Sequence, residues 1–321
     1  CSFYFRLPLT TTAVYNQPMP ELSIDLLPGL KLKNPVIAAS GTAGYGDEPG
    51  RFYDIADLGA FICKGTTFKP RPGNPQPRVM ETPCGMLNAI GLQNPGVAAV
   101  IEKYAPLWRQ WPTPVFVNIA ADSIEEYAEL AGRLDRVPGI AALEVNISCP
   151  NVKAGCLEFG ATPQSAAAVT AAVKRVVSLP VIVKLTPNTS DITALARAVA
   201  EAGADAVSLI NTLRGMAIDI RKHRPVLGNI TGGLSGPAVK PVALAMVWQV
   251  AGAVQIPVIG GGGITSAEDA IEFILAGAGA VEVGTAALVN PAALPEIING
   301  LDNYLTQNNL ARISDLTGAA R

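Results

Sequence analysis

Residues 257–285 read PVIGGGGITSAEDAIEFILAGAGAVEVGT and contain one complete strand–helix–strand unit. Pro257–Gly260 is a short apolar run that ends in glycine, and Ala280–Val283 is a second apolar run. Between them, Ser266–Ala276 carries apolar residues at intervals of three and four, which is the spacing of one helix face. A helix between two apolar strands predicts that the strands are parallel, because parallel strands need a long crossover connection.

The same unit recurs along the chain. Continuous apolar strands are typical of sheets that are buried on both faces, and eight strand–helix units without a low-complexity break predict an α/β fold, the (β/α)8 TIM barrel, rather than an open doubly wound sheet. Between the strands, helical spacing appears over Ser123–Arg136, Thr162–Val177, Asp191–Ala202 and Ser266–Ala276. The expected strands are Val36–Ala39, Ala60–Lys64, Val115–Asn118, Ala142–Asn146, Val181–Lys184, Ala206–Ile210, Pro257–Gly260 and Ala280–Val283.

The pattern predicts a single domain over residues 21–321, preceded by an ill-defined N-terminal leader over residues 1–20. Two connections are too long for one crossover helix: Thr66–Pro114 after the second strand and Asn211–Ile256 after the sixth. Long insertions on a barrel usually serve as lids or binding loops. We therefore expect both insertions to contribute to the functional site.

The composition excludes several classes of protein. A net charge of −2 and scattered basic residues argue against nucleic-acid binding. The most apolar stretch, Pro241–Val254, is shorter than the roughly 20 residues of a membrane span, and the first residues lack the pattern of a signal peptide. The 5 cysteines, an odd number and widely spaced, suit reduced thiols and therefore a cytoplasmic location.

A metal centre held by this chain is not expected. The sequence has 1 histidine, His223, and neither a CxxC nor an HxxxH pair. His223 lies in the segment Arg221–Pro225, which has the composition of a solvated loop. A catalytic triad built on this histidine is therefore disfavoured.

Every predicted strand ends in a polar residue or in glycine. The active site of a barrel of this kind lies at the carboxyl ends of its strands, so these end residues should converge on one rim. Lys64 and Lys184 are the most informative, because a buried ammonium is costly without a compensating anion or polar ligand. They predict an electron-rich ligand. The strand ends are Ser40-Gly41, Lys64-Gly65, Asn118, Asn146, Lys184, Asn211-Thr212, Gly261-Gly262-Gly263 and Gly284-Thr285.

Two features of the rim favour a flavin mononucleotide as this ligand. The glycines after the seventh strand and Gly284-Thr285 after the eighth can offer backbone N–H groups to a phosphate. Asn118 and Asn146 each offer a donor and an acceptor to a heterocycle. The glycine run does not match the GxGxxG pattern of a Rossmann NAD site. A phosphate-binding barrel isomerase or lyase without flavin would share these glycines and remains a distant alternative.

A thiol follows the fourth strand directly, in Asn146-Ile147-Ser148-Cys149-Pro150-Asn151. A single cysteine after a strand is more often an inert buried thiol, but its place on the rim makes Cys149 a candidate for catalysis. Cys156 is the competing thiol in the same loop.

From about Leu22 to Gln307 the chain resembles the class 1 dihydroorotate dehydrogenases. The matching motifs occur in the same order along the chain, which makes the resemblance specific. They are Lys33-Asn34-Pro35-Val36, Ala39-Ser40-Gly41, Lys64-Gly65-Thr66, Asn88-Ala89-Ile90-Gly91-Leu92-Gln93-Asn94-Pro95-Gly96, Asn146-Ile147-Ser148-Cys149-Pro150-Asn151, Gly232-Gly233-Leu234-Ser235-Gly236 and the two glycine turns.

This resemblance implies an FMN enzyme that oxidises (S)-dihydroorotate to orotate in the synthesis of pyrimidines. Cys149 would remove the proton from C5 of the substrate while a hydride passes from C6 to N5 of FMN. Substrate would contact Lys64, Asn88, Ala89, Ile90, Gly91, Leu92, Asn146, Asn211 and Thr212. FMN would contact Ser40, Lys64, Gly65, Asn118, Asn146, Lys184, Ile210, Gly236, Gly262, Gly263, Gly284 and Thr285.

The segments Asn88–Gly96 and Arg214–Asp219 look like the NAD-linked branch of the family. That branch implies a partner subunit carrying FAD and a [2Fe–2S] cluster, which passes electrons to NAD+, and a homodimer core within a heterotetramer. A fumarate-dependent class 1 enzyme and a dihydropyrimidine-oxidising flavoprotein remain alternatives. The leader, residues 1 to about 20, has no counterpart in the family pattern.

Overall fold

The computed structural model of the chain describes residues 20–46, 52–148 and 159–321, and its centre is a closed barrel. Each strand of the barrel pairs in parallel with both of its neighbours. The predicted fold is therefore confirmed, with three strands at their predicted boundaries and the others within two residues of them. In ring order the strands are β10 (Ala206–Leu209), β15 (Val258–Gly261), β16 (Ala280–Val283), β3 (Val36–Ala38), β4 (Ala60–Thr66), β7 (Val115–Ile119), β8 (Ala142–Asn146) and β9 (Val181–Lys184).

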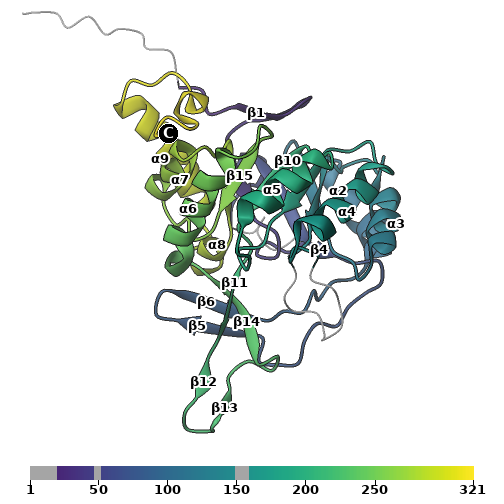
Figure 1. Ribbon diagram of the computed structural model, residues 1–321. Coiled ribbons are helices and arrows are strands. Elements are labelled where there is room, and N and C mark those ends of the chain that lie inside the picture. Colours follow the sequence, from purple (N-terminus) through teal and green to yellow (C-terminus); the bar gives the residue numbers. More distant parts are fainter. Residues whose placement is uncertain (1–19, 47–51, 149–158) are drawn as a thin grey trace, which may run out of the picture.

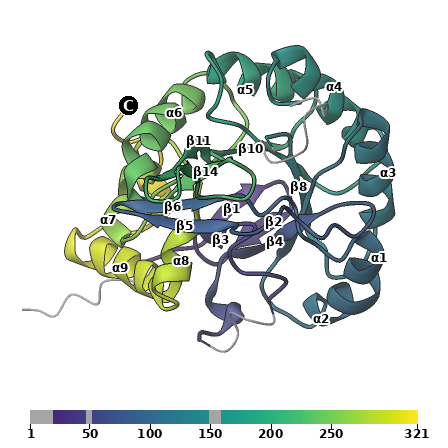
Figure 2. The same ribbon diagram turned by 90° about the horizontal axis from the view of Figure 1, so that it is seen from below.

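The helices surround the barrel (Figure 2). The four predicted helices are confirmed as α3 (Ile124–Leu134), α4 (Pro163–Lys174), α5 (Ile192–Glu201) and α7 (Ala267–Leu275). Each begins after a residue whose side-chain oxygen accepts a hydrogen bond from a backbone N–H of the first turn. Such caps satisfy amides that would otherwise lack a partner, so local sequence determines where these helices start. The capping residues are Ser123, Thr162, Asp191 and Ser266.

The remaining helices complete this outer layer and the C-terminal region. The helix after the barrel strand β16 is short, and α9 is the longest helix of the described residues. None of the helices in the described ranges is both long and apolar enough to cross a bilayer. The remaining α-helices are α1 (Val97–Ala99), α2 (Ala105–Trp108), α6 (Lys240–Ala251), α8 (Thr285–Val289) and α9 (Ala293–Gln307); a π-helical turn spans Val100–Tyr104, and 3-10 turns span Ile55–Asp57, Pro237–Val239 and Ile313–Leu316.

The two insertions pair with each other beyond one end of the barrel. Strands β5 (Val79–Thr82) and β6 (Gly85–Asn88) come from the first insertion, whereas β11 (Leu213–Met216) and β14 (Thr231–Ser235) come from the second. They form one antiparallel sheet in the order β11-β14-β6-β5, joined through the β14–β6 pairing. Figure 1 shows this sheet below the barrel, on the side opposite the antiparallel hairpin of β1 (Ile24–Leu27) and β2 (Leu30–Leu32).

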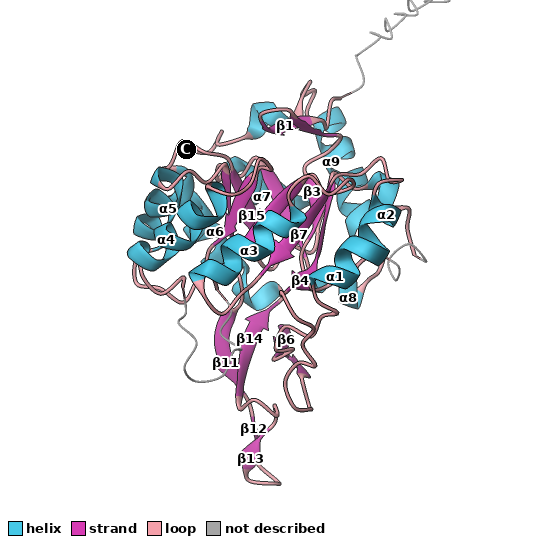
Figure 3. Cartoon of the chain, turned by 90° about the vertical axis from the view of Figure 1, so that its right-hand side faces the viewer, coloured by secondary structure: helices cyan, strands magenta, loops and turns pink. Residues whose placement is uncertain are grey.

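The second insertion also projects away from the barrel. Its tip is the short antiparallel hairpin of β12 (Ile218–Asp219) and β13 (Arg224–Pro225), which extends beyond the sheet (Figure 3). His223 lies in the exposed turn between these strands, which confirms the solvated loop predicted for it. The insertions have a small apolar core of their own, built from Leu87, Ala89 and Leu227.

The predicted leader, residues 1–20, lies outside the described residues apart from its last position, so the domain boundary at residue 20 stays a prediction.

Candidate active site

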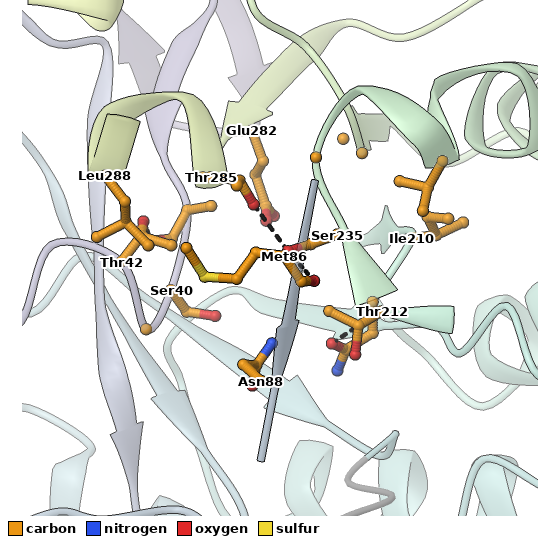
Figure 4. A pocket seen from close by; sticks show the side chains of 18 of the residues that line it. Ser40, Thr42, Met86, Asn88, Ile210, Thr212, Ser235, Glu282, Thr285 and Leu288 are labelled. Carbon is orange, nitrogen blue, oxygen red and sulfur yellow. Dashed lines mark hydrogen bonds between the residues drawn. The ribbon is translucent and has the colours of Figure 1, made fainter. Parts of the chain in front are cut away.

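A large cavity lies between the barrel rim and the sheet formed by the insertions. Its floor comes from the carboxyl ends of the barrel strands, and its cover comes from β6 and β14, represented by Met86, Asn88 and Ser235. Figure 4 shows the side chains of Met86 and Asn88, together with those of Ser40 and Thr285, around the cavity. The cavity encloses about 1480 Å³, its open mouth included. Glycines, asparagines, hydroxyl groups and lysines line it, so the cavity offers backbone N–H groups, amides and charge to a polar ligand.

All twelve residues that the family resemblance assigned to FMN line this cavity. They come from both halves of the chain, and the barrel closure brings them to one rim. Their roles remain predictions, whereas their convergence is an observation. The twelve are Ser40, Lys64, Gly65, Asn118, Asn146, Lys184, Ile210, Gly236, Gly262, Gly263, Gly284 and Thr285.

The residues assigned to the substrate also line the cavity, with one exception. Ala89 is fully buried in the small core of the insertions and does not reach the cavity. Its backbone is also occupied, because its N–H donates to the carbonyl of Arg78 and its carbonyl accepts from Nδ2 of Asn74. The position of Ala89 therefore gives it a structural role. The residues that do line the cavity are Lys64, Asn88, Ile90, Gly91, Leu92, Asn146, Asn211 and Thr212.

Hydrogen bonds hold the amide side chains of the rim in fixed orientations. Nδ2 of Asn118 donates to Oγ of Ser40 at 3.3 Å and to Oε2 of Glu144 at 2.5 Å. Oδ1 of Asn146 accepts from Nδ2 of Asn211 at 3.2 Å and from the backbone N–H of Ser148 at 3.1 Å. The protein's own hydrogen bonds therefore orient these rim side chains, which lowers the ordering cost of binding.

The glycine turns at the ends of β14 and β15 bring backbone close to backbone. Gly262 and Gly263 have φ values of +125° and +80°, which side-chain-bearing residues rarely adopt. A Cβ on Gly263 would lie 2.8 Å from the backbone nitrogen of Lys240 and 2.9 Å from the carbonyl oxygen of Gly236. Opposite them, Oγ1 of Thr285 donates to Oγ of Ser235 at 2.9 Å. A glycine-lined cradle beside two hydroxyls suits a phosphate.

A buried cluster of charges occupies the cavity floor. Nζ of Lys184 lies 3.3 Å from Oε1 of Glu144 and 2.5 Å from Oε2 of Glu282. The side chains of all three are at most 8% exposed. The sequence predicts that a bound ligand compensates the charge of Lys184. The structure shows instead that two carboxyl groups of the protein compensate it, so Lys184 by itself does not indicate an electron-rich ligand.

The two carboxyl groups of this cluster differ in their pKa. Burial and, after it, the charge of Glu144 raise the pKa of Glu282 to about 8, although Lys184 opposes the rise. Burial acts on Glu144 in the same direction, but Lys184 and hydrogen bonds from its neighbours hold the pKa of Glu144 below its usual range. Burial opposes the charged form of Lys184, yet the two carboxyl groups raise its pKa well above the usual range.

The sequence reading missed Glu144 and Glu282, although both lie inside predicted strands. Glu144 is the third residue of β8 and Glu282 the third residue of β16, and both strands are otherwise apolar up to their ends. An acidic residue in the middle of a strand that is buried on both faces must face a partner charge or a ligand. That rule, applied to each strand, would have identified both residues.

The proposed base, Cys149, and its competitor Cys156 lie outside the described residues. The chain on either side is fixed. Oγ of Ser148 donates to the carbonyl of Lys184 at 2.8 Å, and the backbone N–H of Gly160 donates to the carbonyl of Ile147 at 2.8 Å. Ser148, the last described residue before the thiol segment, is therefore bonded to the strand that carries the cavity residue Lys184.

The other thiols of the described residues give no sign of metal binding or catalysis. Cys63 is buried within the barrel, and burial raises its pKa to about 12. Cys84 is exposed and also free. In the part of the chain that is described, no group of three histidine, cysteine or acidic residues is arranged to hold a metal ion.

Comparison with known sequences gives a consistent result. A family model described as "Dihydroorotate dehydrogenase" matches residues 24–305. The chain is 58% identical over 300 residues to the "Dihydroorotate dehydrogenase B (NAD(+)), catalytic subunit" of Pelobacter propionicus, covering 94% of this chain and 98% of that protein. It is 60% identical over 291 residues to the protein of the same name from Desulforamulus reducens, covering 91% and 96%.

Among solved structures, the chain is similar in fold to DHODH from Eimeria tenella in complex with ferulenol. The TM-score is 0.79 at 24% identity, over 95% of this chain and 90% of that one. At this identity the likeness supports the barrel fold and no more.

Proposed function

Because this chain belongs to the dihydroorotate dehydrogenase family, we propose that it is the FMN-binding catalytic subunit of an NAD-linked enzyme that oxidises (S)-dihydroorotate to orotate in pyrimidine biosynthesis. One observation carries the proposal beyond family membership. Every residue assigned to FMN, and all but one of those assigned to the substrate, line a single cavity.

The residues of this cavity fit the parts of FMN. Gly236, Gly262, Gly263, Gly284 and Thr285 would receive the phosphate, because backbone N–H groups and a hydroxyl can approach it without obstruction by side chains. The asparagines and lysines of the rim would hold the ring through paired donors and acceptors. When bound, FMN would supply the hydride acceptor, N5. The asparagines and lysines that would hold the ring are Lys64, Asn118, Asn146 and Lys184, and Ser40, Gly65 and Ile210 line the cavity with them.

The substrate would bind under the cover of the first insertion. Asn88, Asn211 and Thr212 bring amide and hydroxyl groups to the cavity, and Lys64 offers a cation to the carboxylate of dihydroorotate. Cys149 would remove the proton from C5 of the substrate. A free thiol has a pKa of about 8.5, so its thiolate fraction is small at neutral pH unless the site shifts it. We therefore expect the rate of FMN reduction to increase from about pH 6 to about pH 9.

The names of the relatives carry the phrase "catalytic subunit", so we infer a partner subunit for this chain. We propose that the partner carries FAD and a [2Fe–2S] cluster, accepts electrons from FMN and reduces NAD+, and that two chains form a homodimer core within a heterotetramer. The cytoplasmic location predicted from the cysteines stays a prediction.

The proposal is tested by mixing the FMN-loaded chain anaerobically with dihydroorotate and following the flavin absorbance. We expect bleaching of the flavin bands. Replacement of Cys149→Ala should slow this bleaching by at least ~100-fold, which is the usual contribution of a positioned general base, and should leave FMN bound. Cys156→Ala is the matched control and should retain the rate. Protein that binds FMN but does not bleach would contradict the substrate assignment, and equal effects of both replacements would reject Cys149 as the base.

A further inference from the structure

The buried cluster of Glu144, Lys184 and Glu282 contains two acids and one base. With all three groups ionised, the cavity floor would carry a net negative charge away from water, which is costly. One proton on either carboxyl group makes the cluster neutral. The question is which of the two carboxyl groups holds it.

The hydrogen bonds around the two carboxyl groups are unequal. Glu144 accepts from Nδ2 of Asn118, from Oγ of Ser208 at 2.8 Å, and from Nζ of Lys184. Glu282 receives a hydrogen bond from Lys184, on Oε2. Its other oxygen, Oε1, is buried and has no donor among the described residues. Several donors stabilise a carboxylate, whereas a buried oxygen that lacks a donor disfavours one.

We propose that Glu282 is a positioning residue for the floor of the ring-binding site. It keeps the single proton of the cluster and shares it with Glu144 in a hydrogen bond. The floor is then neutral, and one N–H of Lys184 points to the bound ligand. A protonated carboxyl group is neutral, so protonation removes the negative charge that buried Oε1 would otherwise carry without a donor. Lys184 has three N–H groups, of which Glu144 and Glu282 engage two. This inference rests on the proposed function in taking the ligand to be FMN.

The surroundings of Glu282 leave Glu144 and Lys184 as the groups that control this proton. Glu282 is paired with Ile37 of β3 on one side and with Gly261 of β15 on the other, and neither can ionise. Burial and Glu144 favour the protonated form, and Lys184 opposes it. Lys64 lines the same cavity and is a further cation on the rim.

As a consequence, the net charge of the cluster beneath the ligand depends on pH. While Glu282 is protonated, the positive charge of Lys184 is balanced by Glu144 alone. Once Glu282 loses its proton, the cluster gains a net negative charge, and electrons added to a ring above it are less stable. The midpoint potential of bound FMN should then fall relative to that of a protein in which position 282 cannot ionise.

The test compares the FMN-loaded chain with Glu282→Gln, in which the amide can accept from Lys184 and donate to Glu144 as a protonated carboxyl group does. At about pH 6 the two midpoint potentials should agree. At about pH 9 the wild-type potential should lie about 30 mV or more below that of the variant, which is a tenfold change in equilibrium constant for a two-electron couple. Glu144→Gln removes the carboxylate that favours the protonated form of Glu282, so Glu282 should ionise beside Lys184 and the cluster should stay neutral; its potential should therefore agree with that of the wild type at about pH 6 and lie above it at about pH 9.

A second measurement uses the FMN-free protein. Infrared spectra at about pH 6 should contain the carbonyl stretch of a protonated carboxyl group in the wild type, and Glu282→Gln should remove it. Absence of this band from the wild type would overturn the inference. The inference would also be overturned if the midpoint potentials of the wild type and of Glu282→Gln differed by the same amount at both pH values, or if they agreed at both. Failure to bind FMN would contradict the proposed function instead, and the infrared result would still decide where the proton lies.

Discussion

At the scale of single residues, three charged side chains, Glu144, Lys184 and Glu282, interrupt the otherwise apolar interior of the barrel. Glu144 and Glu282 face each other and Lys184 across the lumen of the barrel, at the level where core packing gives way to the cavity. Replacing such a cluster by apolar residues often preserves or increases stability. The presence of this cluster therefore suits a role in the cavity rather than in folding.

Glu282 should also make stability depend on pH. Its pKa is about 8 in the folded protein, against 4.5 as the ordinary value, so the folded state binds the proton more tightly. The resulting stabilisation is complete below about pH 4.5 and is lost as the pH rises to about 8. Relative to wild type, Glu282→Gln should therefore gain unfolding free energy over this interval, by up to about 1.4 kcal/mol per pH unit.

Urea denaturation of the FMN-free wild type and variant at about pH 5 and about pH 7.5 measures this difference. Because both proteins share the titrating groups outside the cluster, the change in their difference reports on Glu282 together with its partner Glu144. A difference that stays constant between the two pH values would mean that Glu282 titrates normally.

At the scale of elements, the turn after β15 shows how a strand end becomes a binding surface. Gly263 lies at φ +80° with the backbone of Lys240 and Gly236 close to its missing Cβ. The position therefore excludes side chains for two reasons, backbone conformation and space. The sequence shows only a run of glycines. The structure shows that the close approach of neighbouring backbone requires glycine at position 263.

We predict that Gly263→Ala weakens FMN binding by at least about tenfold, because the loop must shift by several tenths of an ångström to admit the methyl group and because alanine at this φ costs roughly 1 kcal/mol or more. Isothermal titration of the FMN-free protein with FMN gives the affinity. The matched control is Gly132→Ala: Gly132 lies in the exposed face of α3, and a Cβ there meets nothing within 4 Å.

That control should keep the affinity for FMN and should raise the unfolding free energy by roughly 0.5–1 kcal/mol, since alanine favours a helix interior over glycine. Normal FMN affinity in Gly263→Ala would show that the turn has more freedom than its contacts indicate, and would remove the glycine cradle from the proposed phosphate site.

At the scale of the whole molecule, the cavity exists because two distant insertions pair with each other. Residues 85–88 and 231–235 form adjacent strands, and the resulting sheet covers the barrel rim. Figure 2 shows this sheet across the open end of the barrel. Neither insertion could cover the rim alone, because an isolated two-stranded hairpin is only marginally stable.

The proposed division of labour between two subunits makes a prediction at this scale. The purified chain should be reduced by dihydroorotate but should transfer electrons to NAD+ at least ~100-fold more slowly than in the presence of the partner subunit, because the partner would supply the redox centres between FMN and NAD+. Stopped-flow measurement of NADH formation, with and without the co-purified partner, tests this. Rapid reoxidation of the isolated chain by fumarate would favour the fumarate-dependent alternative.

The sequence by itself determined the fold class, the eight strands, four capped helices and most of the rim. These features follow local rules: two faces of a buried strand are apolar, a helix begins at a capping side chain, and a parallel strand ends in a residue that points into the site. The family resemblance then supplied the roles of residues that composition alone left open, including Cys149.

Only the tertiary structure decided which charges meet and which residues turn away from the cavity. Lys184 and Glu282 are separated by 98 positions in the chain, and Ala89 follows the cavity residue Asn88 directly yet packs into a separate core. Closure of the barrel brings residues that are distant in the sequence into contact, and no local pattern identifies these partners. In the insertions, the pairing of the strands determines which side chains face the cavity. The charge balance of the cavity floor is therefore a property of the closed barrel and not of any one strand.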